Sequence, residues 1–149
     1  MGRAQRAPAF SLLSLEGERV ALDDLRGQVV VLDFWATWCA PCVAEIAELK
    51  KAFKERYSGN DALVVVLVSI DTEKDKVAPF VEKHGLPFLV LHGDGKVDGQ
   101  YLGSGGIPHL YVIDQEGQIR FHVEGFAAEH FHEHLDWMID AVLRRGNED

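Results

Sequence analysis

The sequence predicts an α/β fold in which a central mixed β-sheet is flanked by helices. Two continuous apolar runs, residues 29–35 and 63–70, have the length and composition of strands that are buried on both faces. Stretches with apolar residues at helical spacing follow them, which is the pattern of strands joined by crossover helices. A chain of 149 residues, 47% of them hydrophobic, is long enough for one domain with a full core.

The chain before the first run is expected to form a small N-terminal β-hairpin over residues 7–25. Short apolar segments alternate there on either side of a turn at Gly17. Residues 28–145 would then form the core of a single domain, 1–149. Within it, an amphipathic helix is expected from residue 41 to about residue 57.

A second helix is expected after the strand at 63–70. Thr72 and Asp75 resemble the two ends of a capping box, which would open a helix that runs to about His84 with a kink at Pro79. Residues 88–91 are expected to form a short strand.

The C-terminal part begins with a Gly-rich stretch, residues 93–106, which predicts a loop with one short helix. Residues 110–113 and 119–123 flank the turn sequence 114–117 and predict a β-hairpin. A last amphipathic helix is predicted by four apolar residues at helical spacing: Phe131, Leu135, Ile139 and Val142.

The charge of the chain is −9, with charged residues at 26%. Lys and Arg do not cluster beyond short pairs, so neither nucleic acid nor an anionic membrane is an expected partner. No stretch has the length of a membrane-spanning helix, and residues 1–9 lack the apolar core of a secretory signal. We therefore expect no membrane contact by this chain, although an exported domain without its leader would begin in the same way.

Both cysteines of the chain, Cys39 and Cys42, lie three residues apart where the first strand runs into a helix. A structural zinc site needs four ligands, and no second cysteine pair exists. A purely structural disulfide across so short a loop would remove little unfolded-chain entropy. The favoured interpretation is a redox-active dithiol.

Cys39 is predicted to be the nucleophile of this pair. An unperturbed thiol has a pKa of about 8.5, so a reactive cysteine needs stabilisation of its thiolate. Cys39 gains this from the helix N-terminus and is the more exposed position, whereas Cys42, one turn deeper, would resolve the mixed disulfide.

Two carboxylates are candidates to accept the proton of Cys42. Glu45 lies three residues after Cys42, on nearly the same helix face, although a solvated surface glutamate would fit there too. Asp33 is the only charged residue in an apolar strand, where a carboxylate must be paired, protonated or functional. We expect both to buffer this proton.

Several segments together resemble the thioredoxin-like TlpA/ResA family of thiol-disulfide oxidoreductases, within the AhpC/TSA-redoxin-like superfamily. The resemblance covers nearly the whole chain in order, and it is most specific around the cysteines. The segments that carry it are Ala7-Pro8-Ala9-Phe10, Leu25-Arg26-Gly27, Phe34-Trp35-Ala36-Thr37-Trp38-Cys39-Ala40-Pro41-Cys42, Gly106-Ile107-Pro108 and Val112-Ile113-Asp114-Gln115-Glu116-Gly117.

The resemblance implies a thioredoxin-like fold and the same roles for the two cysteines. It also implies that the Ile107–Pro108 bond is cis and lies against the cysteine pair, leaving the Ile107 backbone free to bind an extended partner segment. A glutamate at position 45 is typical of this family, and the aspartate at position 33 resembles the one that thioredoxin itself has at the corresponding place. One departure is His109, where the family commonly has Thr.

Substrate contacts are expected beside the cysteines, with His109 able to influence potential, pH dependence or partner choice. Trp35 and Trp38 are expected to be partly core and partly docking surface. The full set of expected substrate-binding residues is Trp38, Ala40, Pro41, Ile107 and His109.

The sequence thus predicts an enzyme that reduces protein disulfides, with a thiol protein as electron donor. The resemblance places it in the periplasm or otherwise outside the cytoplasm, in cytochrome c maturation or disulfide control, with a cytoplasmic location as the alternative. A net oxidant or isomerase, and a non-enzymatic binding module or redox sensor, remain open. A peroxidase is disfavoured because Ala36 stands where peroxiredoxins need Thr or Ser.

No cofactor and no metal are expected. His130 and His134 share a helix face, but no third clustered ligand accompanies them and His132, so they are interpreted as surface histidines. The glycines of residues 103–106 lack the strand and lysine of a phosphate-binding loop.

Overall fold

Six strands form one mixed sheet in the order β1-β8-β7-β4-β5-β6 in the computed structural model, which describes residues 5–147. The two ends of the predicted domain, 1–4 and 148–149, lie outside the described residues. The central strand β4 pairs in parallel with β5 and antiparallel with β7, so the predicted mixed sheet is confirmed. The strands are β1 (Gln5–Arg6), β4 (Val29–Trp35), β5 (Leu63–Ser69), β6 (Leu89–His92), β7 (His109–Ile113) and β8 (Gln118–Glu124).

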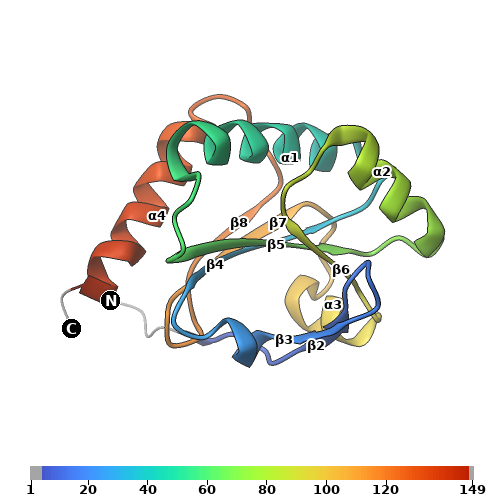
Figure 1. The fold of residues 1–149 in the computed structure, drawn as a ribbon, viewed down its shortest axis with the longest axis horizontal. Helices are drawn as coiled ribbons and strands as arrows, with labels where there is room; N and C mark the ends of the chain where they lie inside the picture. The colour runs from blue at the N-terminus through green and yellow to red at the C-terminus, as the bar shows by residue number, and fades with distance from the viewer. Residues whose placement is uncertain (1–4, 148–149) are drawn as a thin grey trace.

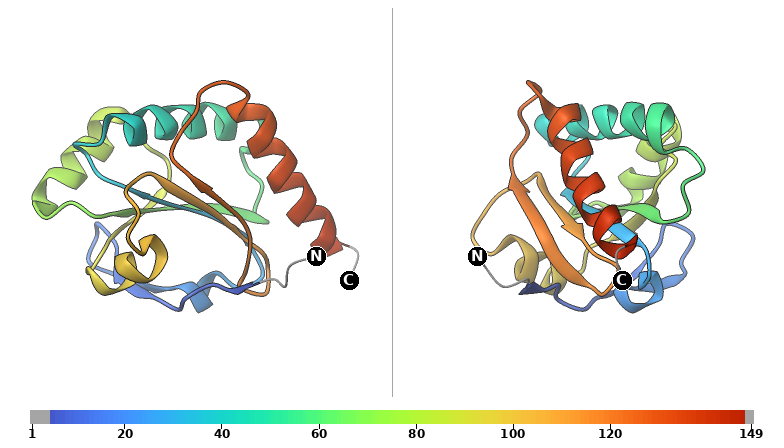
Figure 2. Two further views of the ribbon diagram at one scale, coloured as in Figure 1. Left: turned by 180° about the vertical axis from the view of Figure 1, so that it is seen from behind. Right: turned by 90° about the vertical axis from the view of Figure 1, so that its left-hand side faces the viewer.

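Helices cover the sheet on both faces (Figures 1 and 2). One face carries α1 (Ala40–Ala52), α2 (Val77–His84) and α4 (Phe131–Asn147), and the other carries α3 (Lys96–Leu102). The predicted N-terminal hairpin is present on the α3 side as β2 (Ser11–Leu13) and β3 (Arg19–Ala21). Within residues 5–147, no helix is both long enough and apolar enough to cross a bilayer.

Strand β4 is buried along its whole length because its two faces belong to two separate cores. Val29, Val31 and Trp35 pack in the core beneath α1 and α4. Val30, Leu32 and Phe34 pack in the core beneath α3 and the hairpin. This double burial explains the continuous apolar run, and the alternation along the strand puts Asp33 on the α1 face.

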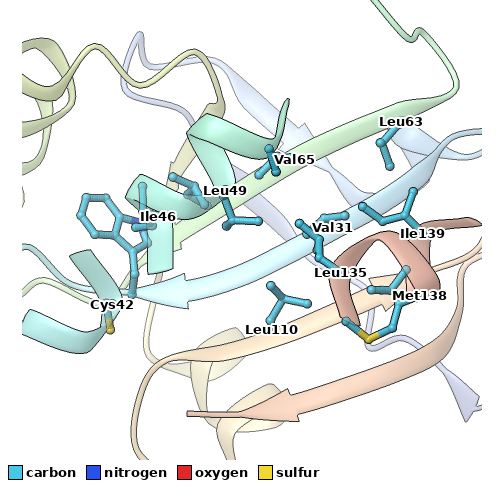
Figure 3. Close-up of a cluster of buried hydrophobic side chains, with 14 of the residues drawn as sticks. Val31, Cys42, Ile46, Leu49, Leu63, Val65, Leu110, Leu135, Met138 and Ile139 are labelled. Atoms are coloured by element: carbon cyan, nitrogen blue, oxygen red, sulfur yellow. The ribbon is translucent and has the colours of Figure 1, made fainter. Parts of the chain in front are cut away.

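Figure 3 shows how α1 enters the first of these cores. Cys42, Ile46 and Leu49 come from one face of α1, above β4 and β5, and all three are buried. Leu135 and Ile139 of α4 occupy the same apolar layer. The second cysteine is therefore a core residue as well as a site residue.

The first predicted helix is present as α1 followed by a π-helical turn, Phe53–Tyr57. Cys39 is the N-cap of α1, and Pro41 lies in the first turn. Backbone N–H groups of a first turn have no intrahelical acceptor, so the absence of an N–H on proline costs no hydrogen bond there.

The predicted capping box at Thr72 is wrong. A short 3-10 turn, Lys74–Lys76, comes first, and α2 begins at Val77 without a side-chain cap. Residues 72–76 are exposed and offer no apolar face for packing, whereas Val77 is fully buried. Pro79 lies in the first turn, where backbone N–H groups have no intrahelical partner, so α2 continues through it to His84.

The later elements agree with the pattern. The short strand, the short helix in the Gly-rich loop and the last amphipathic helix correspond to β6, α3 and α4. The predicted hairpin is β7 with β8, and its turn is closed by Asp114, whose Oδ1 accepts hydrogen bonds from the amides of Glu116 and Gln118. Strand β1, which pairs with β8, was not predicted, because two exposed residues carry no periodic signal.

The turn between β4 and α1 is held by Asp71, which is 6% exposed. Its carboxylate accepts hydrogen bonds from the backbone N–H of Thr37 at 3.1–3.2 Å and from the Thr37 hydroxyl at 2.6 Å. It also accepts one from the Ser69 hydroxyl at 2.6 Å. The chain that leaves β5 thereby fixes Thr37, two residues before Cys39.

Replacing Asp71 by Ala should therefore lower the free energy of unfolding by about 1.5–3 kcal/mol, the usual range for hydrogen bonds to a charged group. Denaturant unfolding of the oxidised protein measures it, with Asp75→Ala as the exposed control. An Asp71→Ala variant as stable as the control would contradict this assignment.

Candidate active site

Cys39 and Cys42 form a disulfide across the start of α1, with their Cα atoms 5.2 Å apart. The Cys39 sulfur accepts the backbone N–H of Cys42 at 3.3 Å, and it lies 4.0 Å from the carbonyl oxygen of Ile107. Cys39 is 6% exposed and Cys42 is 0% exposed. An incoming group can therefore reach the sulfur of Cys39 more readily than that of Cys42.

This geometry favours a thiolate at Cys39 once the disulfide is reduced. A sulfur at the N-cap of a helix receives a backbone N–H and lies at the positive end of the helix dipole. Both effects stabilise negative charge on it, and the thiolate is the form that exchanges with disulfides.

The Ile107–Pro108 peptide bond is cis, and it precedes β7 directly. Ile107 forms part of an open pocket of about 450 Å³ in front of Cys39. Four of the five residues expected to contact substrate line this pocket: Trp38, Ala40, Pro41 and Ile107. The fifth, His109, is buried and packs against the loop at Gly105, so it does not line the pocket.

The two tryptophans differ, contrary to the expectation that each is half core and half surface. Trp35 is 0% exposed and stacks at a tilt on Phe80, with ring centroids 5.3 Å apart. Trp38 is 69% exposed. The reason is strand alternation followed by a turn, since Trp35 is the last inward residue of β4 and Trp38 follows the change in chain direction.

Asp33 and Glu45 are both buried, at 0% and 1% exposure, so a solvated surface position for Glu45 is excluded. Burial raises the pKa of Asp33 well above its ordinary value, and repulsion from Glu45 raises it further. Burial also raises the pKa of Glu45, although interaction with Asp33 partly offsets this. Neither oxygen of Asp33 nor Oε1 of Glu45 has a hydrogen-bond partner among the described residues.

Glu45 differs from Asp33 in that it lines a second pocket, of about 320 Å³. The walls of this pocket come from β7, β8, α4 and the loop between β8 and α4, and most of the lining side chains are apolar, among them Leu110, Phe121, Phe131, Trp137 and Met138. Asp33 is not among its lining residues. Of the two carboxyl groups, Glu45 thus has the route toward solvent.

Two polar contacts near the site were missed in the sequence. One is the Asp71 network described above, and the other is a contact of 2.9 Å between His109 Nδ1 and His122 Nε2. The expected register of the β7–β8 hairpin could have indicated the second.

His134 of α4 and His130 are exposed, as expected of surface histidines. His130 precedes α4 with a φ of 62°, so the expectation that it shares a helix face with His134 is wrong. His132 is half-buried, and its Nε2 lies 2.8 Å from Oε1 of Glu48.

A family model described as the AhpC/TSA family matches residues 4–122. The chain belongs to this family. Its relatives include the thioredoxin-like protein YneN of Bacillus subtilis, 34% identical over 89% of this chain and 78% of the relative. The thiol-disulfide oxidoreductase ResA of Bacillus anthracis is 35% identical over 93% of this chain and 77% of the relative.

Solved structures of similar proteins show the same fold. A candidate protein disulfide isomerase from Bacteroides thetaiotaomicron is 27% identical and has a TM-score of 0.85, with 99% of this chain and 94% of that chain covered. A thiol:disulfide interchange protein of the thioredoxin family from Chlorobium tepidum has a TM-score of 0.79 at 23% identity, with 96% and 99% covered. This AhpC/TSA member is a thiol-disulfide oxidoreductase with a thioredoxin-like fold, of the ResA type.

The buried carboxyl groups predict how stability depends on pH. Their pKa values are higher in the folded protein than in the unfolded chain, so the folded state binds more protons. Their contribution to the free energy of unfolding is therefore present below about pH 4, the unfolded pKa, and is lost as the pH rises toward the folded values.

Asp33→Asn should reduce the stability that is lost as the pH rises, because an amide does not ionise. The stability of the variant relative to the oxidised wild type is expected to increase as the pH rises from 4 to 8, measured by denaturant unfolding at each pH. Asp75→Asn, on an exposed carboxylate, should show no such trend. A stability difference for Asp33→Asn that stays constant with pH would refute the assignment.

Proposed function

We propose that this chain reduces disulfides of protein substrates, with Cys39 as the attacking and Cys42 as the resolving cysteine. The observation that supports this most directly is the unequal placement of the two sulfurs. The sulfur of Cys39 sits at a helix N-cap beside an open pocket, whereas Cys42 is buried one turn deeper.

In the proposed reaction, the Cys39 thiolate attacks one sulfur of the substrate disulfide and releases the other as a thiolate, which takes up a proton. Cys42 then loses its proton and attacks the Cys39 sulfur. This step releases the second substrate thiolate and forms the Cys39–Cys42 disulfide. The substrate gains two electrons, and a thiol protein donor restores the dithiol.

Substrate binding is proposed along the rim of the pocket in front of Cys39. The backbone of Ile107 would pair with an extended substrate segment, as in β-strand addition. The exposed Trp38 provides apolar area, and Ala40 and Pro41 leave the approach to the sulfur unobstructed. His109 would act through the loop that it supports.

Asp33 and Glu45 are proposed to accept the proton of Cys42. A thiol in an apolar core ionises with difficulty, so it needs a nearby base. A carboxylate whose pKa is raised by burial is a better base than an ordinary one. Asp33 lies on the face of β4 toward α1, and Glu45 comes from α1 itself. Glu45 would then pass the proton out through its apolar pocket.

The proposed location is the periplasm or another space outside the cytoplasm, with cytoplasmic action as the alternative. A role in cytochrome c maturation or in extracytoplasmic disulfide control follows from the resemblance to ResA-type relatives. The likeness to a candidate disulfide isomerase makes isomerisation the second function to test. The reduction potential separates the two, since thioredoxin lies near −270 mV and disulfide isomerase near −180 mV.

The unequal roles of the cysteines predict which variant traps a substrate. Cys42→Ser should accumulate a mixed disulfide between Cys39 and insulin, visible by mass spectrometry, because the resolving thiol is absent. Cys39→Ser should trap nothing, and both variants should fail to accelerate insulin reduction by dithiothreitol. Equal trapping by both variants would contradict the assignment, and no acceleration by the wild type would favour a binding module.

Replacing both carboxyl groups predicts a slower resolving step. The Asp33→Asn/Glu45→Gln variant should resolve a preformed Cys39 mixed disulfide about 100-fold more slowly near neutral pH, with the rate recovering as alkaline pH ionises Cys42 directly. Stopped-flow tryptophan fluorescence measures the rate. The matched control is Asp75→Asn/Glu82→Gln, which removes two exposed carboxylates. An unchanged rate and pH profile would remove both residues from the mechanism.

A further inference from the structure

The β7–β8 hairpin brings together three side chains that take no direct part in the thiol-disulfide exchange: His109, His122 and Glu124. His109 is paired with Glu124 across the strands, and Tyr111, two residues along, is paired with His122. Residues two apart share a face, so all three side chains project from one face of the sheet. Their possible ligand atoms all lie within 4.8 Å of one another.

The cluster is partly held in place by its surroundings. His109 is 4% exposed, and its ring packs so closely against the loop that a Cβ atom added at Gly105 would lie 2.9 Å from Nε2. The His122 ring stacks on the Tyr111 ring, with centroids 4.1 Å apart and an angle of 5° between the ring planes. Tyr111 in turn donates a hydrogen bond to the carbonyl oxygen of Tyr101. Both imidazoles are therefore positioned from outside the cluster.

The two imidazoles face each other through one nitrogen each, His109 Nδ1 and His122 Nε2, 2.9 Å apart. When both imidazoles are neutral, a single proton between these two nitrogens forms a hydrogen bond that accounts for the contact. Two nitrogens that each bind a tetrahedral zinc ion at 2.0–2.1 Å lie about 3.3 Å apart, so a small outward shift of the exposed His122 would admit the ion in place of the proton. The carboxylate of Glu124 supplies a third ligand.

We propose that His109, His122 and Glu124 form a binding site for one Zn²⁺ ion. Two imidazoles and a carboxylate are ligands that zinc prefers, and three protein ligands leave a fourth position for water. No cysteine belongs to the site. It therefore exists while the Cys39–Cys42 disulfide is closed, and it lies at the start of β7, directly after Pro108.

Two exposed histidines at the start of α4 provide the internal comparison. His130 directly precedes α4 and His134 lies in its first turn, with ring centroids 6.2 Å apart. Such a pair is the obvious competing site for a metal ion. Removing it distinguishes binding on the hairpin from binding on the helix.

The test is calorimetric titration of untagged, oxidised full-length protein with Zn²⁺ in the absence of reductant, so that neither cysteine sulfur can bind the metal. One ion per chain should bind. Both His122→Ala and Glu124→Gln should weaken binding about 10-fold or more, whereas His130→Ala/His134→Ala should bind like the wild type. Co²⁺ in place of Zn²⁺ should give the visible absorption of a tetrahedral site, which His122→Ala should lose.

Binding of wild-type affinity in either His122→Ala or Glu124→Gln overturns the proposed site, as does binding that disappears in His130→Ala/His134→Ala. Absence of any binding to the wild type at millimolar Zn²⁺ also overturns it and leaves a hydrogen-bonded histidine pair. Because His122 and Glu124 are exposed, both variants should fold, and circular dichroism verifies this. None of these outcomes depends on disulfide reduction.

Discussion

The active site depends on the way β4, buried on both faces, ends beneath the first turn of α1. The apolar contacts of β4 fix Trp35 in the core, and the Asp71 carboxylate fixes Thr37, so the turn into the helix is held on both sides of Ala36. That turn places one sulfur at the helix N-cap and the other among Ile46 and Leu49. The reactivity of the pair is thus a result of core packing as much as of the cysteines themselves.

The same burial sets the proton chemistry. Asp33 on the inner face of β4 and Glu45 on the inner face of α1 would lower the stability of the fold if both were ionised, because burial disfavours charge. Their raised pKa values reflect this unfavourable free energy of ionisation. The fold therefore keeps two carboxyl groups of raised pKa in its interior, at some expense in stability above the acidic range. Sites that place titratable groups in apolar surroundings commonly serve chemistry in this way.

The parts of the fold that sequence could predict are those set by long apolar patterns. Strand β4, the cysteine turn and the β7–β8 hairpin follow from runs, spacing and turn residues. The start of α2 did not follow, because a capping pattern is only three or four residues long and the burial of Val77 decides where that helix begins. Asp71 was missed for another reason: it contacts a residue of a distant turn, and only the tertiary fold brings the partners together. The contact of His122 with His109 lies within the predicted hairpin, so it could have been inferred from the register of that hairpin.

The burial of Cys42 has a kinetic consequence. In the proposed mechanism, a thiol that is held in the core next to Cys39 meets the mixed disulfide at an effective concentration set by the fold, and oriented intramolecular groups reach about 10⁵ M or more. No external thiol in a cell approaches such a concentration. The time that a substrate stays attached is therefore governed by the rigidity of the first turn of α1, and any loosening of that turn would lengthen the attachment even if the sulfur chemistry were unchanged.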